Sequence, residues 1–82
     1  MFFKVIWNEK AYEELEKLEP SISKRIFKKV EELQENPYNK DIKRLKGIEA
    51  FRLRIGDYRV IFSVERETIK ILKVGHRRNI YN

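Results

Sequence analysis

Three arginines, Arg52, Arg54 and Arg59, alternate with apolar residues on either side of a Gly-Asp dipeptide. Alternation with a period of two predicts β-strands with one buried face. Glycine at the first position of a two-residue connection favours a type II′ hairpin. The register of such a hairpin places Arg54 opposite Arg59 and Arg52 opposite Ile61, on the face away from the core. Guanidinium groups bind phosphate in a bidentate manner and stay charged, so the pattern predicts an anion-binding face.

The opposition of Arg54 and Arg59 needs an explanation, because like charges placed opposite each other destabilise a sheet. One explanation is that long basic side chains splay outwards and cover the sheet surface. The other is that an anion occupies the space between the two guanidinium groups. We favour the anion, because several cations share this face and no carboxylate lies among them in the strand pattern.

We call the sheet face that carries Arg52, Arg54 and Arg59 the arginine face. The register of the last strand, expected over residues 69–75, determines which other side chains lie on it. If Leu72 and Val74 enter the core, the alternation predicts four further residues on that face, which are Ile71, Lys73, Gly75 and Arg77. Ile61 and Ile71 would then be exposed beside a basic patch. Exposed apolar side chains of this kind indicate a surface that a partner covers.

Two residues near the C-terminus could take part in proton transfer or base recognition. His76 is the single histidine, and histidine is the side chain that ordinarily titrates near neutral pH; the alternative is a structural or solvated histidine. Tyr81 could stack on a nucleotide base, or its ring could close the core. The sequence contains no glycine-rich phosphate loop and no metal-ligand cluster, so we expect neither a metal nor another cofactor.

The charge distribution supports a polyanionic partner. The net charge of +6 is concentrated in the second half, where residues 42–82 hold 11 Lys/Arg against 4 Asp/Glu, whereas residues 1–41 hold 8 against 9. The chain has no cysteine, which fits a reducing cytoplasm. No apolar run reaches the roughly 20 residues that span a bilayer, so we expect no membrane association. With 82 residues, residues 1–82 should form one domain.

The remaining pattern predicts the elements that carry the arginine face. Residues 2–7 are rich in strand formers, and Asn8 is a good N-cap for an amphipathic helix that follows. Pro20 favours the start of a second helix, which Asn36-Pro37 ends. Residues 38–50 are expected to form a loop with at most a short extended piece. The chain is therefore predicted to be α+β, in the order β-α-α-β-β-β, with a helix hairpin on one face of a small, mainly antiparallel sheet.

At these residues the sequence resembles the RelE/ParE superfamily of toxins from type II toxin–antitoxin systems. The matching motifs are Trp7-Asn8, Arg44-Leu45-Lys46-Gly47, Phe51-Arg52-Leu53-Arg54-Ile55-Gly56-Asp57-Tyr58-Arg59-Val60-Ile61-Phe62 and Val74-Gly75-His76-Arg77-Arg78-Asn79-Ile80-Tyr81. The resemblance covers essentially the whole chain, and it implies the same RelE-like α+β fold.

For the RelE branch, the resemblance implies an endoribonuclease that enters the ribosomal A site and cuts messenger RNA. The 2′-hydroxyl attacks the adjacent phosphate without a metal. Carried over by position, Arg59 and Arg77 would stabilise the scissile phosphate and Tyr81 would stack on a base. The residues expected to contact RNA are Lys46, Arg52, Arg54, Lys73 and Arg78. Because arginine is a poor base, His76 and Tyr81 are the candidates for proton removal.

The resemblance also implies a partner, an acidic and partly disordered RelB-like antitoxin that wraps the toxin, in addition to the ribosome and messenger RNA. Two alternatives stay open. The ParE branch implies a protein that inhibits DNA gyrase by binding, without catalysis. An inactive relative would bind only the antitoxin or RNA.

Overall fold

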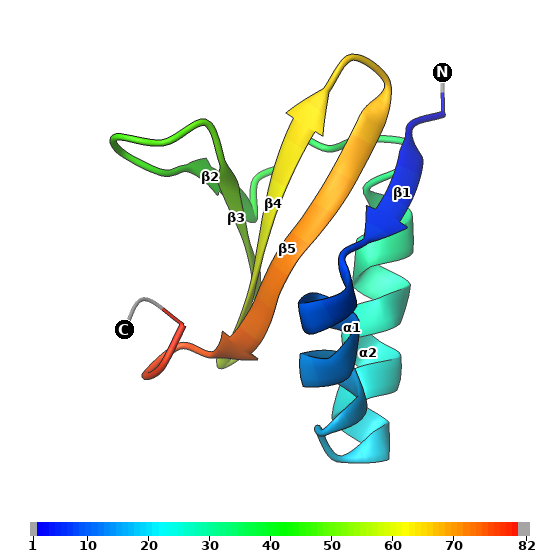
Figure 1. The fold of residues 1–82 in the computed structure, drawn as a ribbon, viewed down its shortest axis with the longest axis vertical. Helices are drawn as coiled ribbons and strands as arrows, with labels where there is room; N and C mark the ends of the chain where they lie inside the picture. The colour runs from blue at the N-terminus through cyan, green and yellow to red at the C-terminus, as the bar shows by residue number, and fades with distance from the viewer. Residues whose placement is uncertain (1, 81–82) are drawn as a thin grey trace.

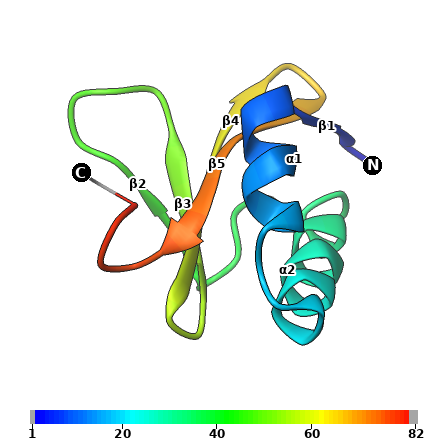
Figure 2. The same cartoon turned by 60° about the horizontal axis from the view of Figure 1, so that its bottom comes forward.

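The fold places two helices against one face of a five-stranded sheet. The computed structural model describes residues 2–80. Figure 1 shows the element order, and Figure 2 shows both helices on one side of the sheet. The elements are β1 (Lys4–Trp7), α1 (Glu9–Glu16), α2 (Pro20–Glu32), β2 (Ile42–Arg44), β3 (Phe51–Ile55), β4 (Tyr58–Glu65) and β5 (Thr68–His76). The α+β prediction is confirmed, with one strand more than the predicted order.

The helix hairpin begins and turns where the sequence indicates. The Asn8 side chain accepts a hydrogen bond from the Ala11 amide at 2.8 Å and so caps α1. Pro20 occupies the first turn of α2, where its missing amide proton costs no intrahelical bond. Ile26 and Val30 of α2 are buried against the sheet. The apolar stripes of both helices therefore cover one sheet face.

The sheet has the order β1-β5-β4-β3-β2, and only the β1–β5 pair is parallel. The additional strand is β2, which pairs with β3 and places Lys43 opposite Arg52. Sequence reasoning assigned residues 38–50 to a loop that could hold a short extended piece, and it did not place that piece, because three residues are too few to show a periodic pattern. Pairing with the neighbouring strand, a non-local interaction, gives these residues their extended conformation.

The β3–β4 hairpin has the predicted register. Leu53 pairs with Val60 on the core face, and Arg54 pairs with Arg59 on the opposite face, which we call the open face. Gly56 has φ +57 at the first position of the turn, and Asp57 does not have a positive φ. This is the combination that a type II′ turn requires.

A β-bulge in β5 changes the predicted positions of two apolar residues. Phe62 pairs with Ile71 whereas Ile61 pairs with Lys73, so β5 has one extra residue, Leu72. Ile71 is consequently buried in the main core, and Leu72 packs on the open face. The prediction that Leu72 enters the core and Ile71 leaves it was wrong, because the two halves of β5 follow different registers.

The open face carries a small apolar cluster of its own. The buried residues Ala50, Ile61 and Ile80 form it, and Leu45 and Leu72 pack against them. Figure 2 shows the last described residues on the side of the sheet away from the helices. The prediction that Ile61 and Ile71 are exposed was therefore wrong, because the C-terminal turn covers one and the main core contains the other.

Candidate nucleic-acid interface

Two rows of side chains cross the open face from strand to strand. One row runs through Lys43 of β2, Arg52 of β3, Ile61 of β4 and Lys73 of β5. The next row runs through Arg54, Arg59 and Gly75. Residues that pair directly across strands project to the same face. Four strands therefore contribute to one surface, and Lys43 joins it because β2 exists.

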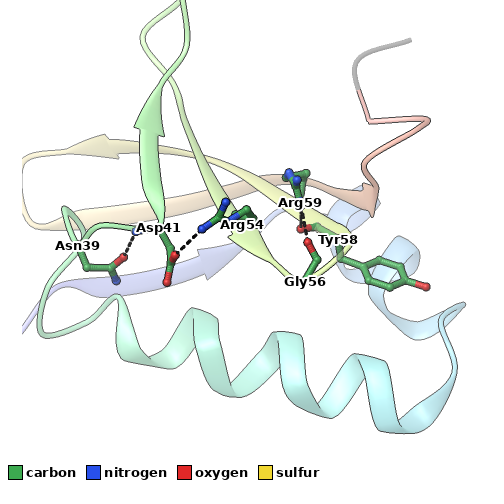
Figure 3. Close-up of polar contacts among 6 residues, drawn as sticks. All are labelled: Asn39, Asp41, Arg54, Gly56, Tyr58 and Arg59. Carbon is green, nitrogen blue, oxygen red and sulfur yellow. Dashed lines mark hydrogen bonds and ion pairs between the residues drawn. The ribbon is translucent and has the colours of Figure 1, made fainter.

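Arg54 and Arg59 are held by different partners, although they pair across the hairpin. The Nη2 atom of Arg54 lies 3.4 Å from Oδ1 of Asp41. The Nη1 atom of Arg59 donates to the carbonyl oxygens of Gly56 and Tyr58, both at 2.8 Å. Figure 3 shows the two side chains pointing apart. These oxygens offset the repulsion between the two guanidinium groups. The prediction that no carboxylate lies among the cations was wrong, because Asp41 pairs with Arg54.

Arg77 is tied to the turn between β3 and β4. Its backbone amide donates to the Asp57 carbonyl oxygen at 2.8 Å, and its Nε lies 3.7 Å from Oδ1 of Asp57. Both side chains are exposed, so the ion pair contributes little to stability. Its effect is positional, because it holds Arg77 beside the turn that also holds Arg59.

An open cleft of about 580 Å³ brings these arginines together with two cations from α2. The lining residues are Arg25, Lys29, Asp41, Arg54, Ile55, Gly56, Asp57, Arg59 and Arg77. We call this depression the basic cleft. Sequence reasoning identified Arg54, Arg59 and Arg77. It missed Arg25 and Lys29, because they lie on the wet side of α2, and no local pattern shows which cations of a helix face a distant turn.

The remaining predicted RNA-binding residues lie outside the basic cleft. Arg52 occupies the neighbouring row, where its Nε is buried without a hydrogen-bond partner. Lys73 shares that row. Lys46 lies in the loop between β2 and β3, beside a separate depression. Arg78 is exposed, and its backbone amide donates to the His76 ring.

His76 lies next to the opposite sheet face. It pairs with Tyr58, whose ring packs against the main core, and the two ring centroids are 5.4 Å apart. The Nδ1 atom accepts a hydrogen bond from the Arg78 amide at 3.2 Å. In this arrangement a neutral ring carries its proton on Nε2 and has no free lone pair with which to accept another. His76 can thus donate a hydrogen bond through Nε2, and it is not among the residues that line the basic cleft.

Tyr81, the other candidate for proton removal or base stacking, lies outside the described residues. Gly75 precedes the C-terminal turn and is in close contact with it. A Cβ atom at Gly75 would lie 3.3 Å from Cδ1 of Ile80. The absence of a side chain at Gly75 therefore lets the turn pack closely on the open face.

The chemistry available to the basic cleft is electrostatic. Five cations face two carboxylates around an open, polar depression. Residues 2–80 contain no group of acidic or histidine side chains that could hold a metal ion. They also contain no helix that is long and apolar enough to cross a bilayer. The arrangement is suited to binding a phosphate and to stabilising negative charge that develops on it.

Comparisons with known proteins identify the family to which the chain belongs. Residues 5–81 match the family described as the ParE toxin of type II toxin–antitoxin systems. The chain is 34% identical to the toxin RelE3 of Methanocaldococcus jannaschii, over 96% of each chain.

Solved structures give the same result. The structure resembles one in the toxin–antitoxin complex RelBE2 of Mycobacterium tuberculosis, with a TM-score of 0.85, 27% identity, and coverage of 94% of this chain and 100% of that one. It also resembles one in the archaeal RelE–RelB complex of Pyrococcus horikoshii, with a TM-score of 0.83 and 30% identity over 96% and 99% of the two chains.

Proposed function

Since the chain belongs to the RelE/ParE superfamily of type II toxin–antitoxin systems and is a toxin of the RelE type, we propose that it is a ribosome-dependent endoribonuclease that cleaves messenger RNA in the A site. The observation that carries the proposal is the convergence of Arg54, Arg59 and Arg77 on one cleft. Three guanidinium groups around an open polar depression are suited to a backbone phosphate.

In the proposed reaction the 2′-oxygen of a ribose attacks the adjacent phosphorus. The bond to the 5′-oxygen of the next nucleotide breaks, which leaves a 2′,3′-cyclic phosphate and a 5′-hydroxyl. The 2′-hydroxyl loses a proton, and the departing 5′-oxygen gains one. Arg59 and Arg77 stabilise the extra negative charge on the phosphate oxygens during the attack. Arg59 is well oriented for this role, because two carbonyl oxygens hold its Nη1 atom.

The two proton transfers require groups other than arginine, since guanidinium remains protonated at any working pH. We assign proton removal from the 2′-hydroxyl to Tyr81, and the departing oxygen takes its proton from solvent water. His76 is given neither transfer, because its neutral imidazole N–H is too weak an acid and its Nδ1 lone pair already accepts from the Arg78 amide. Tyr81→Phe should therefore slow cleavage without weakening RNA binding, whereas His76→Gln should change the rate of cleavage little.

We also propose an acidic RelB-like antitoxin as the protein partner. The basic second half of the chain supports it. The solved relatives from M. tuberculosis and P. horikoshii are described as complexes of toxin and antitoxin. The isoleucines at positions 61 and 71 do not support it, because both are buried.

The experiment that tests the nuclease proposal is RNA-end mapping on programmed ribosomes. Arg59→Ala and Arg77→Ala should each reduce the rate of A-site cleavage by about 10²- to 10³-fold, which is the effect of losing one donor to a developing anion. Arg66→Asn is the matched control, because it removes one positive charge at the distant β4–β5 turn, and asparagine tolerates the positive φ of 56° there. Wild-type protein that leaves the RNA intact would contradict the proposal.

The match to the ParE family description favours one competing function, inhibition of DNA gyrase by binding. A supercoiling assay with purified gyrase separates the two functions. Our proposal expects no inhibition at concentrations that support full cleavage on ribosomes. Inhibition of supercoiling without RNA cleavage would establish the competing function.

A further inference from the structure

Helix α2 presents two cations to the basic cleft that the proposed reaction does not use. Arg25 and Lys29 are four residues apart, so they project from the same side of the helix. Both are exposed, and both line the cleft beside the β3–β4 turn. The phosphate that reacts is assigned to Arg59 of β4 and to Arg77 of the turn that follows β5. The two α2 cations therefore extend the basic surface from the sheet to the helix layer.

The guanidinium group of Arg25 lies beside the turn between β3 and β4. The position of a Cβ atom at Gly56 would be 3.5 Å from each of Nη1 and Nη2 of Arg25 and 3.7 Å from Cζ. Both terminal nitrogens are nearer to this position than Cζ is, so the end of the guanidinium group approaches Gly56. A side chain at position 56 would occupy the space that Arg25 uses.

The charges of the cleft are unequally neutralised. Asp41 pairs with Arg54, and Asp57 pairs with Arg77. Among residues 2–80, no carboxylate lies within ion-pair distance of Arg25. Lys29 pairs with Glu32 of its own helix at 3.6 Å, but both side chains are about half exposed, and such a pair is weak in water. The positive potential on the helix side of the cleft is thus left for an external anion.

We propose that Arg25 and Lys29 form a second phosphate-binding site, for a backbone phosphate of single-stranded RNA next to the phosphate that reacts. This inference rests on the proposed function, since it assumes that the basic cleft receives an RNA strand. The guanidinium plane of Arg25 binds phosphate oxygens in a bidentate manner, and Lys29 adds a point charge. The site positions the strand and takes no part in bond breaking.

The test compares two double variants of α2 in their binding to a short fluorescein-labelled single-stranded RNA. Arg25→Gln with Lys29→Gln removes both cations from the cleft. Lys24→Gln with Lys28→Gln removes the same charge at the same spacing from the same helix. Lys24 and Lys28 are exposed and line the groove between α1 and α2 instead. Thermal unfolding of each variant establishes that the fold is retained.

The readout is the dependence of affinity on salt, measured by fluorescence anisotropy. Each phosphate neutralised on a single strand contributes about 0.7 to the slope of log K against log salt concentration. The cleft variant should therefore lose about 0.7 of slope and bind several-fold more weakly, whereas the groove variant keeps the wild-type slope. Equal losses in both variants would overturn the proposal, because only the net charge would then matter.

Two further measurements complete the test. On ribosomes, the cleft variant should raise KM for cleavage and leave kcat within about threefold, since the site does not contact the reacting phosphate. If the cleft variant binds RNA normally but loses affinity for the antitoxin, the site belongs to a protein partner and the proposal is wrong. The RNA-binding comparison does not require cleavage, so its failure is distinguishable from failure of the nuclease proposal.

Discussion

Arg54 and Arg59 pair directly across the β3–β4 hairpin, yet their guanidinium groups are bound by different oxygens on different sides of the turn. Asp41 holds Arg54, and two backbone carbonyl groups hold Arg59. The two permanent cations are therefore neighbours across the hairpin, and the oxygen atoms bound to each guanidinium group offset their mutual repulsion. An approaching phosphate can displace the exposed carboxylate of Asp41, whereas the carbonyl groups that orient Arg59 belong to the turn itself.

Asp41→Asn should strengthen RNA binding and change stability only slightly. The Arg54–Asp41 pair is largely exposed, and such a pair contributes about 0–1 kcal/mol to folding. The substitution keeps the shape of the side chain and removes a negative charge from the cleft. Fluorescence anisotropy with single-stranded RNA measures the affinity, and urea unfolding measures the stability.

The control for this prediction is Glu49→Gln, which removes one negative charge in the exposed loop between β2 and β3. It should change RNA affinity less than Asp41→Asn does, because Glu49 does not line the basic cleft. Weaker RNA binding by Asp41→Asn would show that Asp41 positions Arg54 rather than competing with RNA for it.

Gly75→Ala should impair function more than stability. The added methyl group would lie 3.3 Å from Cδ1 of Ile80, so the C-terminal turn must shift to accommodate it, at a cost of about 1–3 kcal/mol if it cannot relax. The turn carries Arg77, and its movement should lower the cleavage rate on ribosomes. Thermal unfolding and the ribosome assay measure the two effects.

A double-mutant cycle identifies the clash as the cause. Ile80→Ala removes the atom that the new methyl group meets, so Gly75→Ala should cost less stability in that background than in the wild type. Strictly additive changes in the free energy of unfolding would refute a direct contact between the two positions.

Because of the bulge in β5, an alanine substitution at Ile71 should destabilise the protein more than one at Leu72, the opposite of what a regular strand would give. Ile71 is fully buried in the main core, and Leu72 is half-buried in the smaller cluster on the open face. Ile71→Ala should therefore cost about 2–5 kcal/mol, and Leu72→Ala should cost clearly less. A regular strand with Leu72 in the core would give the reverse order in urea unfolding.

Arg66→Gly should stabilise the protein without affecting cleavage. Arg66 has φ +56 in the turn between β4 and β5, a conformation that costs an L-residue roughly 1–2 kcal/mol. Glycine adopts it freely but loses more backbone entropy on folding, so a net gain of about 0.5–1 kcal/mol is expected. Arg66→Ala is the matched control for loss of the side chain, and it should not raise the melting temperature.

Local patterns predicted the parts of this protein that depend on neighbouring residues. The Asn8 cap and the start of α2 at Pro20 follow from backbone hydrogen-bonding groups within one helical turn. The register of the β3–β4 hairpin follows from a two-residue turn, because a slip by one residue would bury arginine. That register alone was enough to place Arg54 opposite Arg59.

The composition of the basic cleft and the course of β5 depend on contacts between residues far apart in the chain. Strand alternation predicts that every second side chain of a strand lies on the same sheet face. The bulge at Leu72 breaks this alternation, so that Ile71 packs in the main core and the adjacent Leu72 packs in the smaller cluster on the open face. Strand β2 forms because β3 offers it hydrogen-bonding partners. Neither event leaves a periodic signal in the sequence.

The sequence by itself determined that arginines share one face of a hairpin and that the chain is an α+β protein, because both follow from alternation and turn chemistry. Its resemblance to the RelE/ParE superfamily rests on local motifs. Only the tertiary structure decided which groups surround those arginines. Packing of α2 against the sheet brings Arg25 and Lys29 to the β3–β4 turn, and the fold of the C-terminal segment places Arg77 beside Asp57. The physical reason is that an electrostatic site depends on distances between charges, and the packing of helices and strands sets those distances.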